Sequence, residues 1–378
     1  MPTAPVLEDG RIVFRLPDPD HAYASVRLYQ EVQRPRDGLA ATFGDGVWTV
    51  EMPRPVDAHR LEYAFIVDHR DGGEAFLTDP LNPLAADGPF GAKSVVRLPG
   101  YTTPAWLEAP LPQGEGSISW ADLPLPRFAV GLPCGIWQPP GATPEDRLPL
   151  LIAHDGPEYA DLAGLLRLMA VAAATTGIPA TATPTDPARA ALPRLPPWRI
   201  ALLAPVPDRR DETYSAAARY ADALAFTVLP WLERTAPQPP GSRPVLMGAS
   251  LGALAALHAA HRHPGRFGGL FLQSGSYFRL RTDGHERDFA HFDRVSRVVG
   301  QILATTRASR PLPMTMTCGL VEENLANNRV MADALKAAGH DVRLVDSLDG
   351  HTYTAWRDTL DPHLVDLLTR VGVPGAPT

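Results

Sequence analysis

The stretch PVLMGASLGALAALHAAHRHP (residues 244–264) decides the expected fold of this chain. Its centre, GASLG (248–252), fits the pattern G-x-S-x-G. The apolar run before it favours a buried strand, and Leu251 to His263 favours a helix that Pro264 would end. In a nucleophile elbow the serine occupies a strained turn between a strand and a helix, and small neighbours let the two elements approach. The pattern therefore predicts Ser250 as a nucleophile, and the alternative is a helix N-cap serine without chemistry.

Further apolar runs surround this stretch, with helical segments between most of them. They are FAVGLPCGIW (128–137), LPLLIAH (148–154), RIALLAPV (199–206), GGLFLQ (268–273), LPMTMTC (312–318) and VRLVDSL (342–348). Strands that alternate with helices predict an α/β fold with a mostly parallel sheet covered on both faces. We therefore expect an α/β-hydrolase domain over residues 119–378. In such sheets ligands bind beyond the carboxyl ends of the strands.

The first hundred residues have a different rhythm. Short segments with period-two alternation recur about every ten positions between 11 and 99, which predicts a small all-β sandwich over residues 1–100. Residues 101–118 are rich in Pro and Gly without periodicity and are expected to form a linker. Residues 173–197 contain six prolines and predict a long surface loop near the site.

Composition and charge exclude several classes of protein. The 378 residues are 45% hydrophobic and 20% charged, as in globular proteins, and the net charge of -7 argues against a nucleic-acid partner. The N-terminus lacks a secretory signal and no apolar run is long enough to span a membrane, so we expect a cytoplasmic protein without a membrane partner. Cys134 and Cys318 lie in strand-like segments and are expected to be buried free thiols.

A serine hydroxyl needs a base, and His351 is the best placed of the twelve histidines. It follows the last strand-like segment, in agreement with the chain order Ser, acid, His of α/β-hydrolases. His154 precedes a turn near the expected pocket and is a weaker candidate that could line it. The histidines at 258, 261 and 263 share a helix and its end, where packing explains them better than metal ligation.

The acid should follow a strand between Ser250 and His351. The run 313–318 ends in GLVEE (319–323), which makes Glu322 the first choice and Glu323 the second, while a distant acid or a Ser-His dyad stays open. Both carboxylates could instead be favourable charges at a helix N-terminus.

Two amides are needed for the oxyanion that forms during acyl transfer. Leu251, directly after the nucleophile, supplies one. The turn HDGPEY (154–159) should supply the other, and because Pro157 has no N–H the donor is Gly156, Glu158 or Tyr159.

Several segments together resemble the enterochelin esterase family, whose members hydrolyse the trilactone backbone of iron siderophores. The matching segments are Asp155-Gly156, 209–212 with Tyr214, 229–231, the elbow, QSGS (273–276), Glu322, and Gly350-His351 with Trp356-Arg357. In addition, 61–68 with Thr78-Asp79-Pro80 resembles the N-terminal immunoglobulin-like (E-set) domain of enterochelin esterases and glycogen-branching enzymes. In this chain such a domain could cap the neighbouring pocket, support an oligomer contact or bind carbohydrate.

The resemblance implies an acyl-enzyme mechanism on an ester or lactone, with Ser250, Glu322 and His351 as the triad and without a metal or organic cofactor. It also implies arginine contacts to an anionic substrate. The candidates for substrate binding are Arg209, Tyr159 and Trp356, although one arginine of the pair Arg209 and Arg210 is expected to anchor a structural ion pair.

The chain departs from the family at three points. Pro157 stands where relatives offer an amide, the Pro-rich stretch 173–197 is unusual, and Thr352 follows His351 where aspartate is common. The natural ester, a ferric siderophore by first choice, could therefore differ from a catecholate trilactone.

Two other functions stay open, namely a feruloyl or acetyl carbohydrate esterase and a catalytically silent binding protein on a hydrolase fold. The sequence also allows a homo-oligomer.

Overall fold

A computed structural model of the chain describes residues 5–111, 114–176 and 192–372. The chain forms two compact units. One contains Met1–Thr102 together with Gly319–Glu323 and Asp346–Ala355, and the other contains Thr103–Cys318, Asn324–Val345 and Trp356–Thr378. The first unit thus includes two short segments that follow strands of the second. Each unit is described separately below.

The first unit is built on two antiparallel sheets. One has the order β1 (Val6–Glu8), β2 (Arg11–Pro17), β6 (Val47–Pro53), β5 (Thr42–Gly44). The other has the order β4 (Leu39–Ala40), β3 (Tyr23–Gln30), β7 (Arg60–His69), β10 (Lys93–Arg97), β9 (Ala85–Ala86), with β8 (Glu74–Leu77) paired to β7. Alternate residues of both sheets, among them Phe14, Leu28, Trp48 and Phe65, share one buried cluster. The unit is therefore the β-sandwich expected from the alternating pattern.

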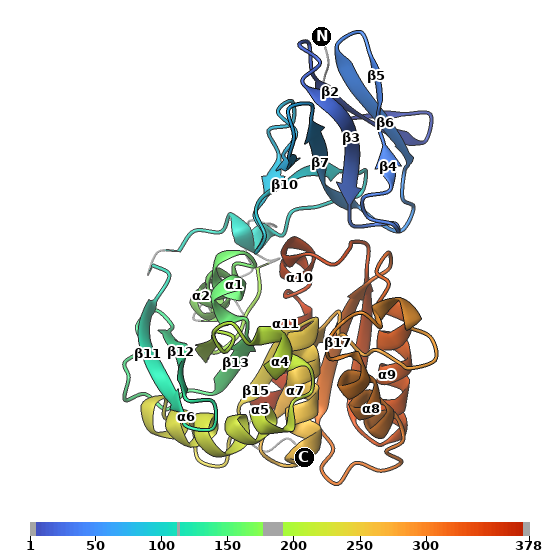
Figure 1. The fold of residues 1–378 in the computed structure, drawn as a ribbon. Helices are drawn as coiled ribbons and strands as arrows, with labels where there is room; N and C mark the ends of the chain where they lie inside the picture. The colour runs from blue at the N-terminus through green and yellow to red at the C-terminus, as the bar shows by residue number, and fades with distance from the viewer. Residues whose placement is uncertain (1–4, 112–113, 177–191, 373–378) are drawn as a thin grey trace. The chain divides into compact units, whose positions relative to one another are not determined.

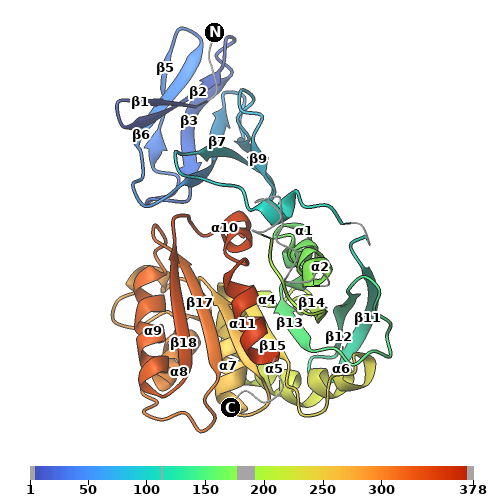
Figure 2. The same ribbon diagram turned by 180° about the vertical axis from the view of Figure 1, so that it is seen from behind.

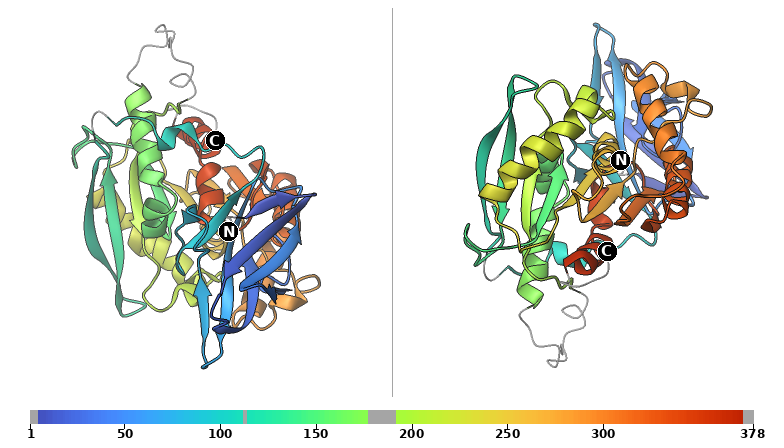
Figure 3. Two further views of the ribbon diagram at one scale, coloured as in Figure 1. Left: turned by 90° about the horizontal axis from the view of Figure 1, so that it is seen from above. Right: turned by 90° about the horizontal axis from the view of Figure 1, so that it is seen from below.

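The second unit contains an eight-stranded sheet, drawn from teal to red in Figure 1. Its order is β11 (Ser117–Leu125), β12 (Val130–Gln138), β14 (Arg199–Leu203), β13 (Leu150–His154), β15 (Val245–Ala249), β16 (Gly269–Gln273), β17 (Pro313–Gly319), β18 (Asp341–Ser347). The strands β14, β13, β15, β16 and β17 run parallel, whereas β11 and β12 form an antiparallel hairpin at one edge, drawn in teal in Figure 3. The predicted mostly parallel sheet of an α/β-hydrolase is confirmed.

Helices cover both faces of this sheet. Figure 1 shows α7 (Leu251–Arg262) with α4 (Arg210–Tyr214), α5 (Ala218–Ala223) and α6 (Leu229–Thr235) on one face, and Figure 2 shows α1 (Gly156–Asp161), α2 (Leu165–Thr176) and α11 (His363–Gly372) on the other. The other helices of the described residues are α8 (Phe292–Leu303), α9 (Leu325–Ala337) and α10 (Tyr353–Asp358), with a π turn over Leu224–Val228 and short 3-10 turns over Ala105–Leu107 and Gly284–Glu286. Among the described helices, none combines the length and the apolar composition that a membrane crossing requires.

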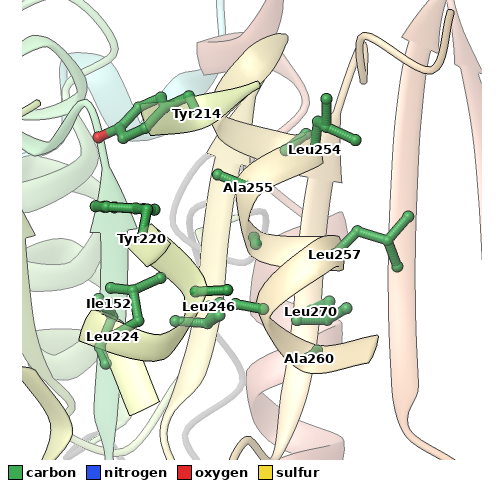
Figure 4. Packing of buried hydrophobic residues seen from close by; sticks show 14 of the residues in the cluster. Ile152, Tyr214, Tyr220, Leu224, Leu246, Leu254, Ala255, Leu257, Ala260 and Leu270 are labelled. Carbon is green, nitrogen blue, oxygen red and sulfur yellow. The ribbon is translucent and has the colours of Figure 1, made fainter. Parts of the chain in front are cut away.

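The core of the second unit holds α7 against the sheet. Leu254 and Leu257 of α7 belong to one buried cluster with Leu246 of β15 and Leu270 of β16, as Figure 4 shows. Gly248 is required where β15 meets α7, because a Cβ at this position would lie 2.6 Å from the backbone carbon of Gly252. This contact fixes how the chain enters the helix.

The structure corrects the sequence analysis at several boundaries. The hairpin strand β11 begins at Ser117, inside the expected linker, and was missed because seven of its nine residues are exposed and it carries no apolar run. Residues 173–176 continue α2, so the loop predicted over 173–197 starts later, and its residues 177–191 lie outside the described part of the chain. Cys134 and Cys318 are buried and free, as expected.

Candidate active site

Ser250 occupies the expected strained turn. Its φ of 55° and ψ of -122° lie between the last residue of β15 and the first residue of α7. Such a conformation costs free energy in a residue with a side chain and persists where the surrounding structure enforces it. Here the backbone amide of Ser250 donates to the Gln273 carbonyl at 2.9 Å, and the Ser276 amide donates to the Ser250 carbonyl at 3.2 Å. The predicted elbow geometry is present.

Buried polar side chains surround the elbow. The hydroxyl oxygens of Ser250 and Ser276 are 3.1 Å apart and share a hydrogen bond. The Gln273 amide donates to the Trp356 carbonyl and to Thr359 Oγ1, at 3.0 and 2.8 Å. Sequence analysis missed the roles of Gln273 and Ser276, although both lie in the segment QSGS (273–276) that carries part of the family resemblance.

The turn at Asp155 follows β13, the strand between β14 and β15 in the sheet. Asp155 adopts a left-handed conformation and α1 begins at Gly156. A Cβ on Gly156 would lie 2.4 Å from the backbone of Leu202, so this position requires glycine. The amide of Tyr159 donates to the Asp155 carbonyl at 3.0 Å. Of the three amides predicted as the second oxyanion donor, Gly156 and Glu158 are the two that this bond does not involve.

The Asp155 carboxylate is held by an arginine. Arg210 Nε and Nη2 donate to its two oxygens, both at 2.8 Å, and the Asp155 side chain is 3% exposed. Burial raises the pKa of the neighbouring Glu158 carboxyl, and burial lowers the pKa of the fully enclosed His154. His154 contacts Tyr214 and Tyr220 edge-on, and its Nδ1 donates to the Met247 carbonyl at 3.1 Å. It is a core histidine.

Glu322 and His351 are hydrogen-bonded in the first unit. His351 Nδ1 lies 2.7 Å from Glu322 Oε2, and the Glu322 side chain is only 2% exposed. The other carboxylate oxygen accepts the Gly319 amide at 2.7 Å. Because a carboxylate only accepts hydrogen bonds, Nδ1 carries the proton and Nε2 keeps a lone pair. The imidazole is therefore set in the tautomer of a general base.

Glu323 makes different contacts. Its carboxylate pairs with Arg34 and with Arg36, the latter at 3.4 Å, and its side chain is 25% exposed. Both arginines belong to the loop after β3. This loop, residues 320–323 and His351 line a hollow of about 200 Å³ within the first unit. Sequence analysis did not single out this loop, since nothing local in EVQRPR (31–36) indicates a neighbour near position 323.

The three predicted substrate-binding side chains have partners within the second unit. Arg209 is bidentate to Glu212, with both distances 2.7 Å. Tyr159 is fully buried and its hydroxyl donates to Gln273 at 2.6 Å. Trp356 is 7% exposed and its Nε1 donates to Ser274 Oγ at 2.9 Å.

Comparisons with known proteins identify the family and the fold of the chain. Residues 131–367 match the family described as "Putative esterase". An iron(III) enterobactin esterase of Dickeya dadantii is 33% identical over 144 residues, which span 36% of this chain and 32% of that protein. The enzyme of the same name from Escherichia coli O6:H1 is 26% identical over 310 residues, 77% of this chain and 67% of the other. The crystal structure of an enterobactin esterase from Shigella flexneri in the presence of enterobactin superposes with a TM-score of 0.73 at 20% identity, covering 96% of this chain and 95% of the other.

Proposed function

This chain belongs to the esterase family and is a carboxylic ester hydrolase, and from that premise we propose that Ser250, His351 and Glu322 hydrolyse an iron-siderophore ester through an acyl-enzyme. The observation that carries the assignment is the 2.7 Å hydrogen bond between Glu322 and His351, which follow the strands β17 and β18, in a chain whose elbow presents Ser250 after β15. A strained serine and an oriented imidazole are the two parts that this chemistry needs.

The register of the sheet supports a common location for the three residues. Ala249, Gln273 and Thr317 are aligned across β15, β16 and β17. Parallel strands lie about 4.8 Å apart, so the chain leaves β15 and β17 at the same edge and about 10 Å apart. Glu322 follows Thr317 by five residues, which is enough chain for an acid and its histidine to approach a nucleophile at that edge.

In the proposed mechanism, His351 Nε2 takes the Ser250 proton as Oγ attacks the ester carbonyl carbon. The tetrahedral intermediate collapses, its C–O bond to the alcohol breaks, and the departing oxygen takes the proton from the imidazolium. Water then gives a proton to Nε2 and attacks the acyl carbon, and Oγ leaves with that proton as the carboxylic acid is released. Glu322 stabilises the imidazolium in both halves of the reaction.

The oxyanion would be bound by backbone amides. Leu251 is the first residue of α7, where the helix supplies no acceptor for its N–H. Gly156 is our first choice for the second donor, because it follows the left-handed Asp155 that Arg210 holds in place. Tyr159 and Trp356 then act through Gln273 and Ser274, as supports of the elbow, in place of the direct substrate contacts first expected.

The substrate class is proposed from the relatives and from the charges of the hollow. Iron(III) enterobactin esterases are the curated relatives, and Arg34 and Arg36 line the hollow that His351 also lines. Guanidinium groups suit an anionic acyl group such as a catecholate. The cytoplasmic location and the formation of a homo-oligomer remain predictions.

A substrate panel tests this proposal. Initial rates would be measured on ferric and iron-free catecholate trilactone, on a feruloyl sugar ester and on p-nitrophenyl acetate, with Ser250→Ala as the control. We expect the trilactone to give the highest kcat/KM and the control to lose nearly all turnover. A faster feruloyl ester would assign the chain to carbohydrate deacylation. A wild-type protein that neither hydrolyses any ester nor forms a fluorophosphonate adduct at Ser250 would be a binding protein.

A further inference from the structure

The β-sandwich contributes a buried arginine to the segment that carries His351. Arg60, the first residue of β7, donates from Nε to Asp349 Oδ2 at 2.9 Å and from Nη2 to Asp349 Oδ1 at 3.2 Å. The same Nη2 donates to Thr352 Oγ1 at 2.6 Å. One guanidinium thus holds residues on both sides of His351. All of these groups belong to the first compact unit.

Arg60 has almost no contact with solvent. Its side chain is 2% exposed, and Nη1 donates to Glu62 Oε1 at 2.7 Å, where Glu62 is 5% exposed. Glu62 in turn lies 3.6 Å from Lys93 Nζ, which pairs with Glu31 at 2.7 Å. Replacing a buried, paired ion by packed apolar groups is often neutral for stability, so such a network is weak evidence for a purely structural function. The residues whose positions this network fixes therefore indicate its function.

The network fixes the backbone next to the base. Asp349 Oδ1 accepts the Gly350 amide at 2.7 Å, and Thr352 Oγ1 accepts the Ala355 amide at 3.2 Å at the start of α10. The His59 amide also donates to the Leu348 carbonyl at 2.7 Å. The segment 348–352 is therefore tied to His59 and Arg60 at positions before and after His351. Thr352, which departs from the aspartate common in the family, has a hydroxyl that accepts the Arg60 hydrogen bond.

From these contacts we propose that Arg60 is a positioning residue, which sets the imidazole of His351 for proton transfer by clamping Asp349 and Thr352. This inference rests on the proposed function. It gives the sandwich a function in catalysis. Without Arg60, the segment 348–352 would be more flexible, and the hydrogen bond to Glu322 alone would not hold Nε2 of His351 in place. A displacement of a catalytic group by about 1 Å can lower the rate about 10²-fold.

The test compares Arg60→Ala, Arg60→Lys and Thr352→Val with two matched controls. Tyr63→Phe removes a buried hydrogen bond to Asp79 from the same strand, and Thr352→Ser keeps the hydroxyl. We expect Arg60→Ala to lower kcat on p-nitrophenyl acetate by about 10²-fold with little change in KM. Thr352→Val should lose activity, while Thr352→Ser and Arg60→Lys, which keep one hydrogen-bonding group, should recover part or all of it.

The rate of fluorophosphonate labelling separates positioning from stability. In the Arg60 variants, the rate constant of labelling at Ser250 should fall in parallel with kcat, while the final labelled fraction stays near that of the wild type. A variant in which some molecules are misfolded would lose labelled fraction, while its folded molecules would keep the rate constant. If Arg60→Ala does not fold, the pair Thr352→Val and Thr352→Ser decides the question.

Equal rate constants in the Arg60 variants, Thr352→Val and Tyr63→Phe would overturn the inference while leaving the esterase intact. An inactive and unlabelled wild-type protein would instead refute the proposed function itself.

Discussion

Replacing Glu322 by glutamine tests which acid serves His351. In the structure the carboxylate accepts two hydrogen bonds, from His351 Nδ1 and from the Gly319 amide, both at 2.7 Å. Glutamine keeps the size of this side chain and one carbonyl acceptor. Its NH₂ group would face Nδ1 as a donor, which favours the tautomer with the proton on Nε2. In that tautomer the imidazole cannot take the proton of Ser250.

The expected loss follows from this change of tautomer and charge. The equivalent amide in a Ser-His-Asp triad lowers kcat by about 10⁴-fold, which at 1.4 kcal/mol per factor of ten is about 5 to 6 kcal/mol of transition-state stabilisation. The cost in folding free energy should be smaller, about 1 to 3 kcal/mol, because one buried hydrogen bond to a charged group is lost. A cooperative unfolding transition should therefore remain.

The assay is kcat on p-nitrophenyl acetate over pH 6 to 9, with urea unfolding of each variant at pH 7. Glu323→Gln is the matched control, since Glu323 is the next residue in the chain and pairs with arginines outside the triad. Its kcat should stay within a few-fold of the wild type. Our reasoning is refuted if Glu322→Gln keeps more than a tenth of wild-type kcat, or if Glu323→Gln is the variant that loses activity.

Three further predictions concern the scaffold. Gly248→Ala should destabilise the chain by about 1 to 3 kcal/mol in urea unfolding, because its Cβ would meet the Gly252 backbone at 2.6 Å; a neutral result would show that β15 and α7 can separate freely. Leu257→Ala should cost about 2 to 5 kcal/mol, measured in the same way, since Leu257 is 1% exposed in the core, and a change below 1 kcal/mol would place it outside that core. Burial lowers the pKa of His258 to about 4, so between about pH 4 and 6.5 the unfolded chain binds more protons than the native one. The free energy of unfolding should rise with pH through this window, by about 3 kcal/mol from this residue. His258→Gln should remove that part of the pH dependence. If His258→Gln leaves the pH dependence unchanged, the histidine titrates normally in the folded protein.

Much of the fold could be predicted from local sequence. Each predicted apolar run of the second unit is a strand in the structure. The helix predicted over Leu251 to His263 ends at Arg262, one residue earlier than expected. Buried parallel strands are apolar over their whole length, so their signal does not depend on distant residues. The exposed strand β11 carried no such signal and was missed.

The candidate site was only partly predictable. The motif at Ser250 contains its own evidence, because strand, glycine, serine and helix are adjacent in the chain. The distinction between Glu322 and Glu323 could not be made locally, since two neighbouring side chains of one loop differ only in where they point. The structure separates them by their partners, His351 for the first and Arg34 with Arg36 for the second.

The sequence by itself determined the order of strands and helices, the elbow at Ser250 and the candidates for base and acid, because these depend on patterns within a few residues. Only the tertiary structure revealed that Arg60 binds Asp349 across 289 residues of chain, and that the loop after β3 lines the hollow beside His351. Contacts between distant segments depend on how whole sheets pack, and a hydrogen bond between two side chains leaves no periodic trace in the residues around either one.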